Sequence, residues 1–238
     1  MAEPDIHVAS VDALTAIFVQ RFALEARRAI AERARFSVVV PGGSVATAFL
    51  PQLLSQPLPW DRCDVFWGDE RAVPLDSPDS NAGAQEALWA VRAPAASLYH
   101  MEGAASDLNL AATSYGATLR SALGDSPRLD IVILGAGEDG HIASLFPGHA
   151  ALELTSPLVT VVEDSPKPPP RRLTMTLPLL AGARWLCIAA FGASKAAAVG
   201  EALANPASPL PLARVLRESA RATVLLDEAA AHSLIERA

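Results

Sequence analysis

The sequence contains few of the residues that mark secreted, membrane-spanning or nucleic-acid-binding proteins. Its 238 residues include only two cysteines, Cys63 and Cys187, with no CxxC pair. Each lies in or beside an apolar run, so we expect buried, reduced thiols. No run approaches the roughly 18 apolar residues of a membrane span, and the first residues do not resemble a signal peptide. We therefore expect a cytoplasmic protein without a membrane partner.

Basic residues are also scarce. The formal net charge is −7 and no basic stripe is present, so we expect no nucleic-acid partner. Among the 19 lysines and arginines, the only lysines are Lys167 and Lys195. Either this is chance, or a compact ammonium is needed at these positions that an arginine fork would not replace.

Aromatic residues make up only 5% of the chain, whereas hydrophobic residues make up 51% and alanine is abundant. This composition suits helices packed on a sheet better than an aromatic-rich β-sandwich. The length and the apolar content fit a single α/β domain over residues 1–238.

Strand-like and helix-like segments alternate along the chain. The predicted strands are 6–9, 36–40, 63–67, 98–101, 131–134, 158–162, 185–191 and 222–226. Helices are predicted after Ser10 or Asp12, over 45–54, 81–91 and 107–123, as a short helix within 173–180, from Lys195 to about 203, over 212–216, and after Asp227. This alternation predicts a doubly wound, mostly parallel sheet with helices on both faces, a Rossmann-like α/β fold.

Residues 129–149 carry the strongest functional signal. An apolar strand runs into Gly135, Gly137 and Gly140 and then into Asp139 and His141. Ligands in open α/β sheets bind at the carboxyl ends of strands, and histidine is the side chain best suited to move a proton near neutral pH. The stretch is either such a site or only a tight strand–helix turn.

Two further turns combine a strand end, glycine and a helix start. Pro41 is followed by Gly42, Gly43 and Ser44, and free backbone N–H groups at such a helix start can bind an anion. Lys195 follows a second strand and Gly192, where its charge opposes the helix dipole and therefore favours a binding role. A plain turn remains the alternative for the first of these sites.

Two charged segments complete the set of candidates. Asp69, Glu70 and Arg71 follow a strand, where they form either a solvated cluster or a wall in which Arg71 binds an oxyanion. A proline-rich loop carries Lys167, Arg171 and Arg172. Prolines stiffen this loop, which either presents its cations to an anionic ligand or is a surface linker.

Read together, these segments resemble the 6-phosphogluconolactonase family. The matching segments are Pro41 to Ser44, Trp67 to Arg71 with Asn81, Leu134 to Gly148, and Lys167 to Thr174, in the family's order. The resemblance implies the fold shared with glucosamine-6-phosphate deaminase and ribose-5-phosphate isomerase. It also implies hydrolysis of 6-phosphoglucono-δ-lactone, a phosphorylated sugar lactone, to 6-phosphogluconate without a metal or an organic cofactor.

The deaminases of the same superfamily are the nearest alternative. Their motif places a glutamate five residues after the histidine, where this sequence has Phe146, whereas their aspartate base matches Asp69. One departure from the lactonase pattern is Pro41, which replaces the usual first serine of its loop. A sugar-phosphate-binding regulator without catalysis is a third possibility, and a monomer and a dimer both remain open.

The resemblance implies a role for each candidate residue. His141 is the expected base, Asp139 orients it or acts directly, and Arg71 polarises the carbonyl or holds a sugar oxygen with support from Asp69 and Glu70. The phosphate is expected on Gly42, Gly43 and Ser44, with charge from Lys195 and Arg171, and with Lys167 and Arg172 as second choices.

Overall fold

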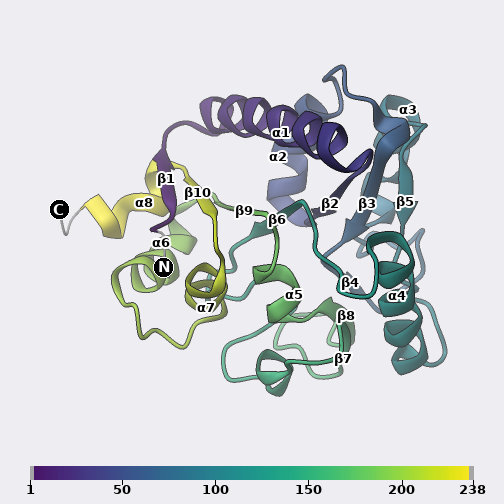
Figure 1. Ribbon diagram of the computed structural model, residues 1–238. Helices are drawn as coiled ribbons and strands as arrows, with labels where there is room; N and C mark the ends of the chain where they lie inside the picture. The colour runs from purple at the N-terminus through teal and green to yellow at the C-terminus, as the bar shows by residue number, and fades with distance from the viewer. Residues whose placement is uncertain (1–2, 236–238) are drawn as a thin grey trace.

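Seven parallel strands form the central sheet of the computed structural model, which describes residues 3–235 (Figure 1). The sheet order is β1-β10-β9-β6-β2-β3-β5, and every neighbouring pair is parallel. The strands are β1 (Asp5–Val8), β2 (Phe36–Val40), β3 (Cys63–Trp67), β5 (Ser97–Tyr99), β6 (Ile131–Gly135), β9 (Trp185–Ala190) and β10 (Ala222–Leu226). The predicted doubly wound α/β fold is confirmed.

The order of the strands reverses between β2 and β6. From β2 the chain continues outward to β3 and β5, and it then returns to β6 on the other side of β2 before reaching β9 and β10. The connections on the two sides diverge at such a reversal and leave a crevice outside the carboxyl ends of the strands. The glycine turns that follow β2 and β6 both open onto this crevice.

Helices cover both faces of the sheet because the strand side chains alternate between two apolar clusters. Val38 and Val40 of β2 pack with α1 (Val11–Arg33), α2 (Gly43–Leu53) and α3 (Gly83–Arg92). Val39 packs on the other face, in a cluster with α4 (Leu108–Leu123), α5 (Leu177–Ala181), α6 (Ala196–Ala204), α7 (Pro211–Glu218) and α8 (Glu228–Ile235). In Figure 1, α1 to α3 lie above the sheet, and α4 and α5 lie below it.

The helix starts follow the expected caps. Ser10 is the N-cap of α1, where its hydroxyl accepts a hydrogen bond from Ala13 N, and Asp227 accepts one from Ala230 N at the start of α8. The helix predicted from residue 81 begins instead at Gly83. The Asn81 side chain hydrogen bonds to Asp69 and is not the cap of α3.

A second sheet, of three antiparallel strands, was not predicted. It contains β4 (Asp69–Arg71), β7 (Val159–Val162) and β8 (Arg172–Met175) in the order β4-β8-β7. The strand predicted over 158–162 therefore exists but lies outside the parallel sheet. Residues 172–175 form a strand that the sequence analysis did not predict, whereas α5 begins after Thr176, one of the two positions at which a short helix was expected within 173–180. Strands this short are stabilised mainly by their partners, so local patterns do not reveal them.

Tyr115 of α4 connects this helix to the carboxyl end of β3. Its buried hydroxyl accepts a hydrogen bond from Trp67 N at 3.1 Å and donates one to Tyr99 O at 2.8 Å. Burial raises the pKa of the Tyr115 phenol, which therefore stays protonated as a donor. The hydroxyl therefore provides hydrogen-bond partners for two backbone groups at the point where β3 ends and the chain turns towards β4.

We predict that Tyr115→Phe lowers the free energy of unfolding by about 1–3 kcal/mol, because it leaves a buried N–H and a carbonyl without partners. Urea denaturation followed by circular dichroism measures this loss. Tyr99→Phe is the matched control, since Tyr99 is only partly buried and its hydroxyl makes a long, 3.3 Å contact with Asp64. Equal losses in the two variants would contradict the assigned role of Tyr115.

Candidate active site

A cavity of about 180 Å³ opens at the carboxyl ends of β2, β6 and β9, where the strand order reverses. The small antiparallel sheet forms one of its walls. Seven predicted site residues line the cavity, namely Gly42, Gly43, Ser44, Asp69, Arg71, His141 and Lys195. Arg172, a second choice in the sequence analysis, and Asn81 line it as well.

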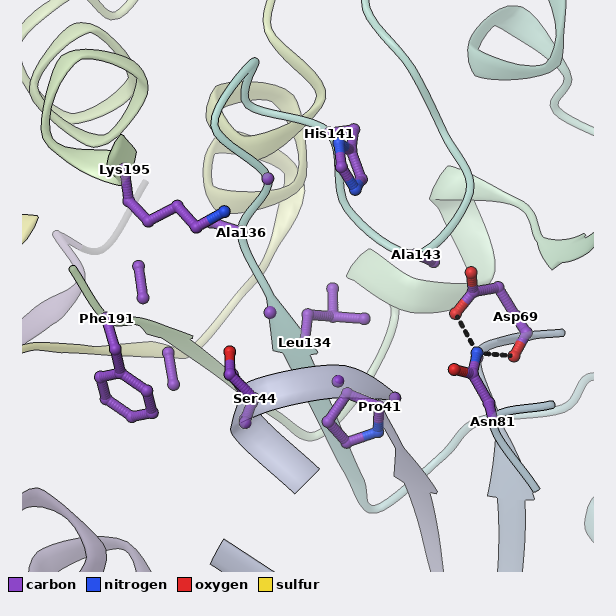
Figure 2. A pocket seen from close by; sticks show the side chains of 18 of the residues that line it. Pro41, Ser44, Asp69, Asn81, Leu134, Ala136, His141, Ala143, Phe191 and Lys195 are labelled. Atoms are coloured by element: carbon purple, nitrogen blue, oxygen red, sulfur yellow. Dashed lines mark hydrogen bonds between the residues drawn. The ribbon is translucent and has the colours of Figure 1, made fainter. Parts of the chain in front are cut away.

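His141 and Asp139 form a close pair at one side of this cavity. Asp139 Oδ1 lies 2.5 Å from His141 Nδ1 and also accepts a hydrogen bond from the His141 backbone N–H at 3.2 Å. A Cβ atom on Gly137 would lie 2.0 Å from His141 Nδ1, so glycine is required for this close packing. The imidazole points into the cavity, between Lys195 and Asp69 (Figure 2).

The electrostatic surroundings favour a neutral His141 with a free Nε2. Burial lowers the pKa of His141 and outweighs the neighbouring Asp139 carboxylate, which raises it. Burial raises the pKa of Asp139, but its contacts with His141 outweigh this effect and leave the pKa below its ordinary value. Because an ionised Asp139 accepts the proton on Nδ1, we assign the lone pair of the neutral ring to Nε2. His141 can therefore accept a proton near pH 7.

The start of α2 and Lys195 form a positively charged pocket for an anion. Gly42 is the N-cap of α2 and has no side-chain cap, so the first N–H groups of the helix are left for a ligand. Gly43 has φ of +64°, which favours glycine, and Ser44 offers a hydroxyl. The Lys195 side chain extends from the opposite side towards the same space (Figure 2). Among the described residues, Lys195 has no ion-pair partner.

Asp69, Asn81 and Ser144 form a connected polar wall. Asp69 Oδ2 accepts a 2.6 Å hydrogen bond from the Ser144 hydroxyl. The Asn81 amide donates to the Asp69 carbonyl at 3.0 Å and to Asp69 Oδ1 at 3.5 Å, as the dashed lines in Figure 2 show. A Cβ atom on Gly42 would lie 1.9 Å from Asn81 Oδ1, so this wall packs directly against the start of α2.

Two arginines face the cavity from directly opposite positions of neighbouring strands. Arg71 of β4 is paired with Arg172 of β8, and both side chains line the cavity. Like charges in such a pair are destabilising. Arg172 donates to the carbonyls of 167–169, and Arg71 donates to the Asp79 carbonyl, while the buried Arg71 Nε has no hydrogen-bond partner. A ligand oxyanion between them would offset this repulsion.

Residues 9–225 match the family of glucosamine-6-phosphate isomerases and 6-phosphogluconolactonases. The chain belongs to this family. A 6-phosphogluconolactonase of Synechocystis is 38% identical over 214 residues, which are 87% of this chain and 88% of that protein. A probable chloroplastic 6-phosphogluconolactonase of rice is 36% identical over 225 residues, 87% of this chain and 68% of that protein.

The solved structures of this family agree with the fold. The 6-phosphogluconolactonase of Trypanosoma brucei superimposes with a TM-score of 0.87 at 29% identity, over 98% of this chain and all of that one. A monomeric glucosamine-6-phosphate deaminase superimposes with a TM-score of 0.80 at 22% identity, which shows the common fold alone. The resemblance that the sequence motifs indicated is therefore confirmed at the level of the family.

Phe146 occupies the position at which the deaminase members of this family carry a glutamate. Its ring is buried, and the ring centroids of Phe146 and His141 lie 4.7 Å apart. Arg172 Cζ lies 5.7 Å from the centroid of the Phe146 ring. It supports the histidine by packing and supplies no charge. His141 therefore has an apolar contact at this position.

Two cations that the sequence assigned to the phosphate do not line the cavity. Lys167 forms an ion pair with Glu138 at 2.8 Å, and Arg171 forms one with Glu163 at 2.6 Å. Successive side chains of an extended strand point to opposite sides, so Arg172 faces the cavity and Arg171 faces away. Of these two arginines, Arg172 therefore lines the cavity, whereas the sequence analysis preferred Arg171.

Glu70 does not line the cavity either, because it is only 2% exposed and lies behind the wall. Its carboxylate accepts hydrogen bonds of 2.8 Å from each of the backbone N–H groups of Arg71, Asn81 and Ala82, and one of 3.1 Å from the Ser80 hydroxyl. Burial raises the pKa of Glu70, and these N–H groups oppose the shift. Glu70 therefore holds together the two segments that carry Arg71 and Asn81.

Ser144 was not among the predicted site residues, although it lies inside the longest motif. Its hydroxyl reaches Asp69 because Ala143, with φ of +47°, turns the backbone between His141 and Ser144. Within residues 3–235, no group of three or more histidines, cysteines and acids is placed to hold a metal ion. No helix in that range is long and apolar enough to cross a membrane.

We predict that Glu70→Ala lowers the free energy of unfolding by about 3 kcal/mol or more, because several buried donors lose one common acceptor. Urea denaturation measures the change. Glu163→Ala is the control, since Glu163 is exposed and forms only a surface ion pair. A loss below about 1 kcal/mol for Glu70→Ala would show that water replaces the carboxylate and that Glu70 does not hold the wall.

Proposed function

We propose that this protein hydrolyses 6-phospho-D-glucono-1,5-lactone to 6-phospho-D-gluconate, the second step of the oxidative pentose phosphate pathway. The observation that carries the proposal is the placement of the half-buried His141, paired with Asp139, in the same cavity as a helix start and a lysine that has no ion-pair partner among residues 3–235. The names of the similar cyanobacterial, plant and trypanosome proteins support the same substrate. We expect the activity in the cytoplasm, where two free, buried thiols are ordinary.

In this proposal the substrate phosphate binds at the start of α2. The N–H groups of Gly43 and Ser44 and the Ser44 hydroxyl are suited to its oxygens, and Lys195 supplies the charge. Pro41 removes the hydroxyl that relatives of this type usually carry at that position. Its carbonyl accepts a 2.8 Å hydrogen bond from Gln85, which holds the loop through the backbone instead.

Hydrolysis then requires a base, an oxyanion site and a proton for the leaving oxygen. His141 Nε2 takes a proton from a water molecule that attacks C1 of the lactone. Arg71 and Arg172 stabilise the oxyanion of the tetrahedral intermediate. When the bond between C1 and the ring oxygen breaks, the protonated His141 returns its proton to that oxygen. The carboxylic acid that forms ionises, so the reaction releases one proton.

Aldose–ketose isomerisation of the deaminase type is the second candidate, because Asp69 is present in the cavity. Two observations disfavour it. Asp69 is engaged by Ser144 at 2.6 Å, and an apolar ring at Phe146 replaces the carboxylate of the deaminase motif. A regulator that binds the sugar phosphate without turnover would have no need for the Asp139–His141 pair.

The deciding experiment measures hydrolysis of freshly prepared lactone through a coupled 6-phosphogluconate dehydrogenase, with the spontaneous reaction subtracted. We predict that His141→Ala lowers kcat/KM by roughly 10²–10⁴-fold, the usual contribution of a general base. His7→Ala, on the distant edge strand β1, is the control. Ammonia release from glucosamine 6-phosphate without lactone hydrolysis would replace the proposal by the deaminase alternative, and binding without either reaction would favour the regulator.

We predict an acid limb in the pH profile of kcat/KM. The rate is full above the pKa of His141 and falls as the pH drops through it, and burial places this midpoint below the ordinary histidine value of 6.5. Asp139→Asn removes a group that raises this pKa, so the limb should move to lower pH while the plateau falls, by up to ~10⁴-fold if the tautomer reverses. A limb that stays in place in Asp139→Asn would contradict the assigned contact.

The two lysines provide a matched pair for the phosphate site. We predict that Lys195→Ala raises KM for the lactone by about tenfold or more, because one charge-assisted contact to phosphate is lost. Lys167→Ala should change KM by less than about threefold, since this lysine is paired with Glu138 outside the cavity. Equal effects of the two substitutions would mean that the loop at 167 closes over the substrate.

A further inference from the structure

A second cavity lies at the opposite end of the sheet, at the amino ends of β2, β3, β6 and β9. It has a volume of about 280 Å³. Four arginines and two aspartates line it, namely Arg33, Arg35, Arg128, Arg184, Asp64 and Asp130. A smaller cavity of about 160 Å³ shares Arg33, Arg128, Asp130 and Arg184 with it. No residue is common to these cavities and the candidate active site.

The two aspartates are already occupied by other partners. Asp64 is bound by Arg35 through Nε at 2.8 Å and Nη2 at 2.5 Å. Asp130 accepts hydrogen bonds from the Ser37 N–H at 2.9 Å and hydroxyl at 3.1 Å, and its other oxygen accepts one from Arg33 at 2.8 Å. Both carboxylates are buried. They therefore offset the charges of Arg35 and Arg33, and Asp130 also lies 3.3 Å from Arg184.

Arg128 and Arg184 retain their charge and most of their donors. Arg128 has no ion-pair partner among the described residues, and its Nε donates only to the Gly182 carbonyl at 3.1 Å. Arg184 Nε lies 3.3 Å from Asp130, but this atom is buried and makes no hydrogen bond of acceptable geometry. Two guanidinium groups with free terminal nitrogens thus border one cavity, in a protein whose net charge is −7.

We propose that this amino-end cavity, lined by Arg128 and Arg184, is a second anion site that binds a small molecule through a diphosphate or a comparable multiply charged oxyanion. Guanidinium groups present pairs of N–H donors that match phosphate and carboxylate oxygens. The four arginines and two aspartates of the lining leave a net charge of +2, which favours a ligand with at least two negative charges over a singly charged one. The site is independent of the proposed lactone hydrolysis, because the two cavities lie at opposite ends of the strands.

The test uses inorganic pyrophosphate as the probe, with citrate as a polycarboxylate and acetate as a singly charged control. Binding is measured by isothermal titration calorimetry on the full chain carrying Lys195→Ala, which weakens competing binding at the active site. We expect saturable binding with one site. Stronger binding of pyrophosphate assigns the site to phosphate, and stronger binding of citrate assigns it to carboxylates.

Arg128→Gln should weaken binding of the preferred anion about tenfold, as expected for one charge-assisted hydrogen bond, and adding Arg184→Gln should weaken it further. Arg92→Gln is the charge-matched control, because Arg92 is exposed on α3 and lines neither cavity. Its effect should stay below about twofold. Lactone hydrolysis by Arg128→Gln with Lys195 intact should equal that of the unmodified protein.

Loss of Arg184 also removes a contact with Asp130, so folding of the double variant is checked by urea denaturation. Ser126→Glu provides a second variant, since Ser126 is an exposed residue of the cavity wall and a carboxylate there should repel the anion. Absence of saturable binding, or equal binding by Arg128→Gln, Ser126→Glu and Arg92→Gln, would overturn the proposal. In that case the arginines serve only as an ion-pair network at the end of the sheet.

Discussion

The adjacency of β2 and β6 in the parallel sheet is the constraint on which the rest of the site depends. These strands are far apart in the chain, and the segment between them forms the whole of one side of the sheet. Parallel pairing places both carboxyl ends at the same edge. The start of α2 after β2 and the turn with His141 after β6 therefore meet without any direct interaction between their side chains. The backbone topology alone brings the proposed anion site and the proposed base into one cavity.

The small antiparallel sheet adds a function that the parallel sheet cannot provide. In the parallel sheet, only the residues that follow a strand lie at the carboxyl edge, beside the cavity. The strands β4 and β8 instead run along the cavity, so that every second residue faces it. Asp69 and Arg71 of β4 face the cavity, while Glu70 between them points to the interior and fixes the backbone of both segments. One short strand therefore separates the residues that line the cavity from the carboxylate that holds them.

Patterns of neighbouring residues predicted the features that depend on neighbouring residues, namely the strands of the parallel sheet and the glycine turns. Strands buried on both faces read as continuous apolar runs, and the turns at Gly42 and Gly137 carry glycines because no Cβ atom fits there. The three-stranded sheet was missed because its stability comes from pairing. For the same reason the sequence could not choose between Arg171 and Arg172. Adjacent arginines in one loop differ only in strand parity, and that parity is fixed by the register of Arg71 with Arg172. The ion pairs of Lys167 and Arg171 likewise involve acids that the sequence does not associate with them.

Phe146 shows how one position can set the direction of proton transfer in this fold. Burial lowers the pKa of His141, and the carboxylates of Asp139 and, more weakly, Asp69 oppose this shift. A second carboxylate at position 146, against the same ring, would raise this pKa further and favour the imidazolium, which is a proton donor. A ring-opening reaction on a sugar needs such a donor, whereas attack by water on a lactone needs an acceptor. The apolar ring at this position adds no carboxylate, so burial still lowers the pKa of His141, as the role of a base in the proposed hydrolysis requires.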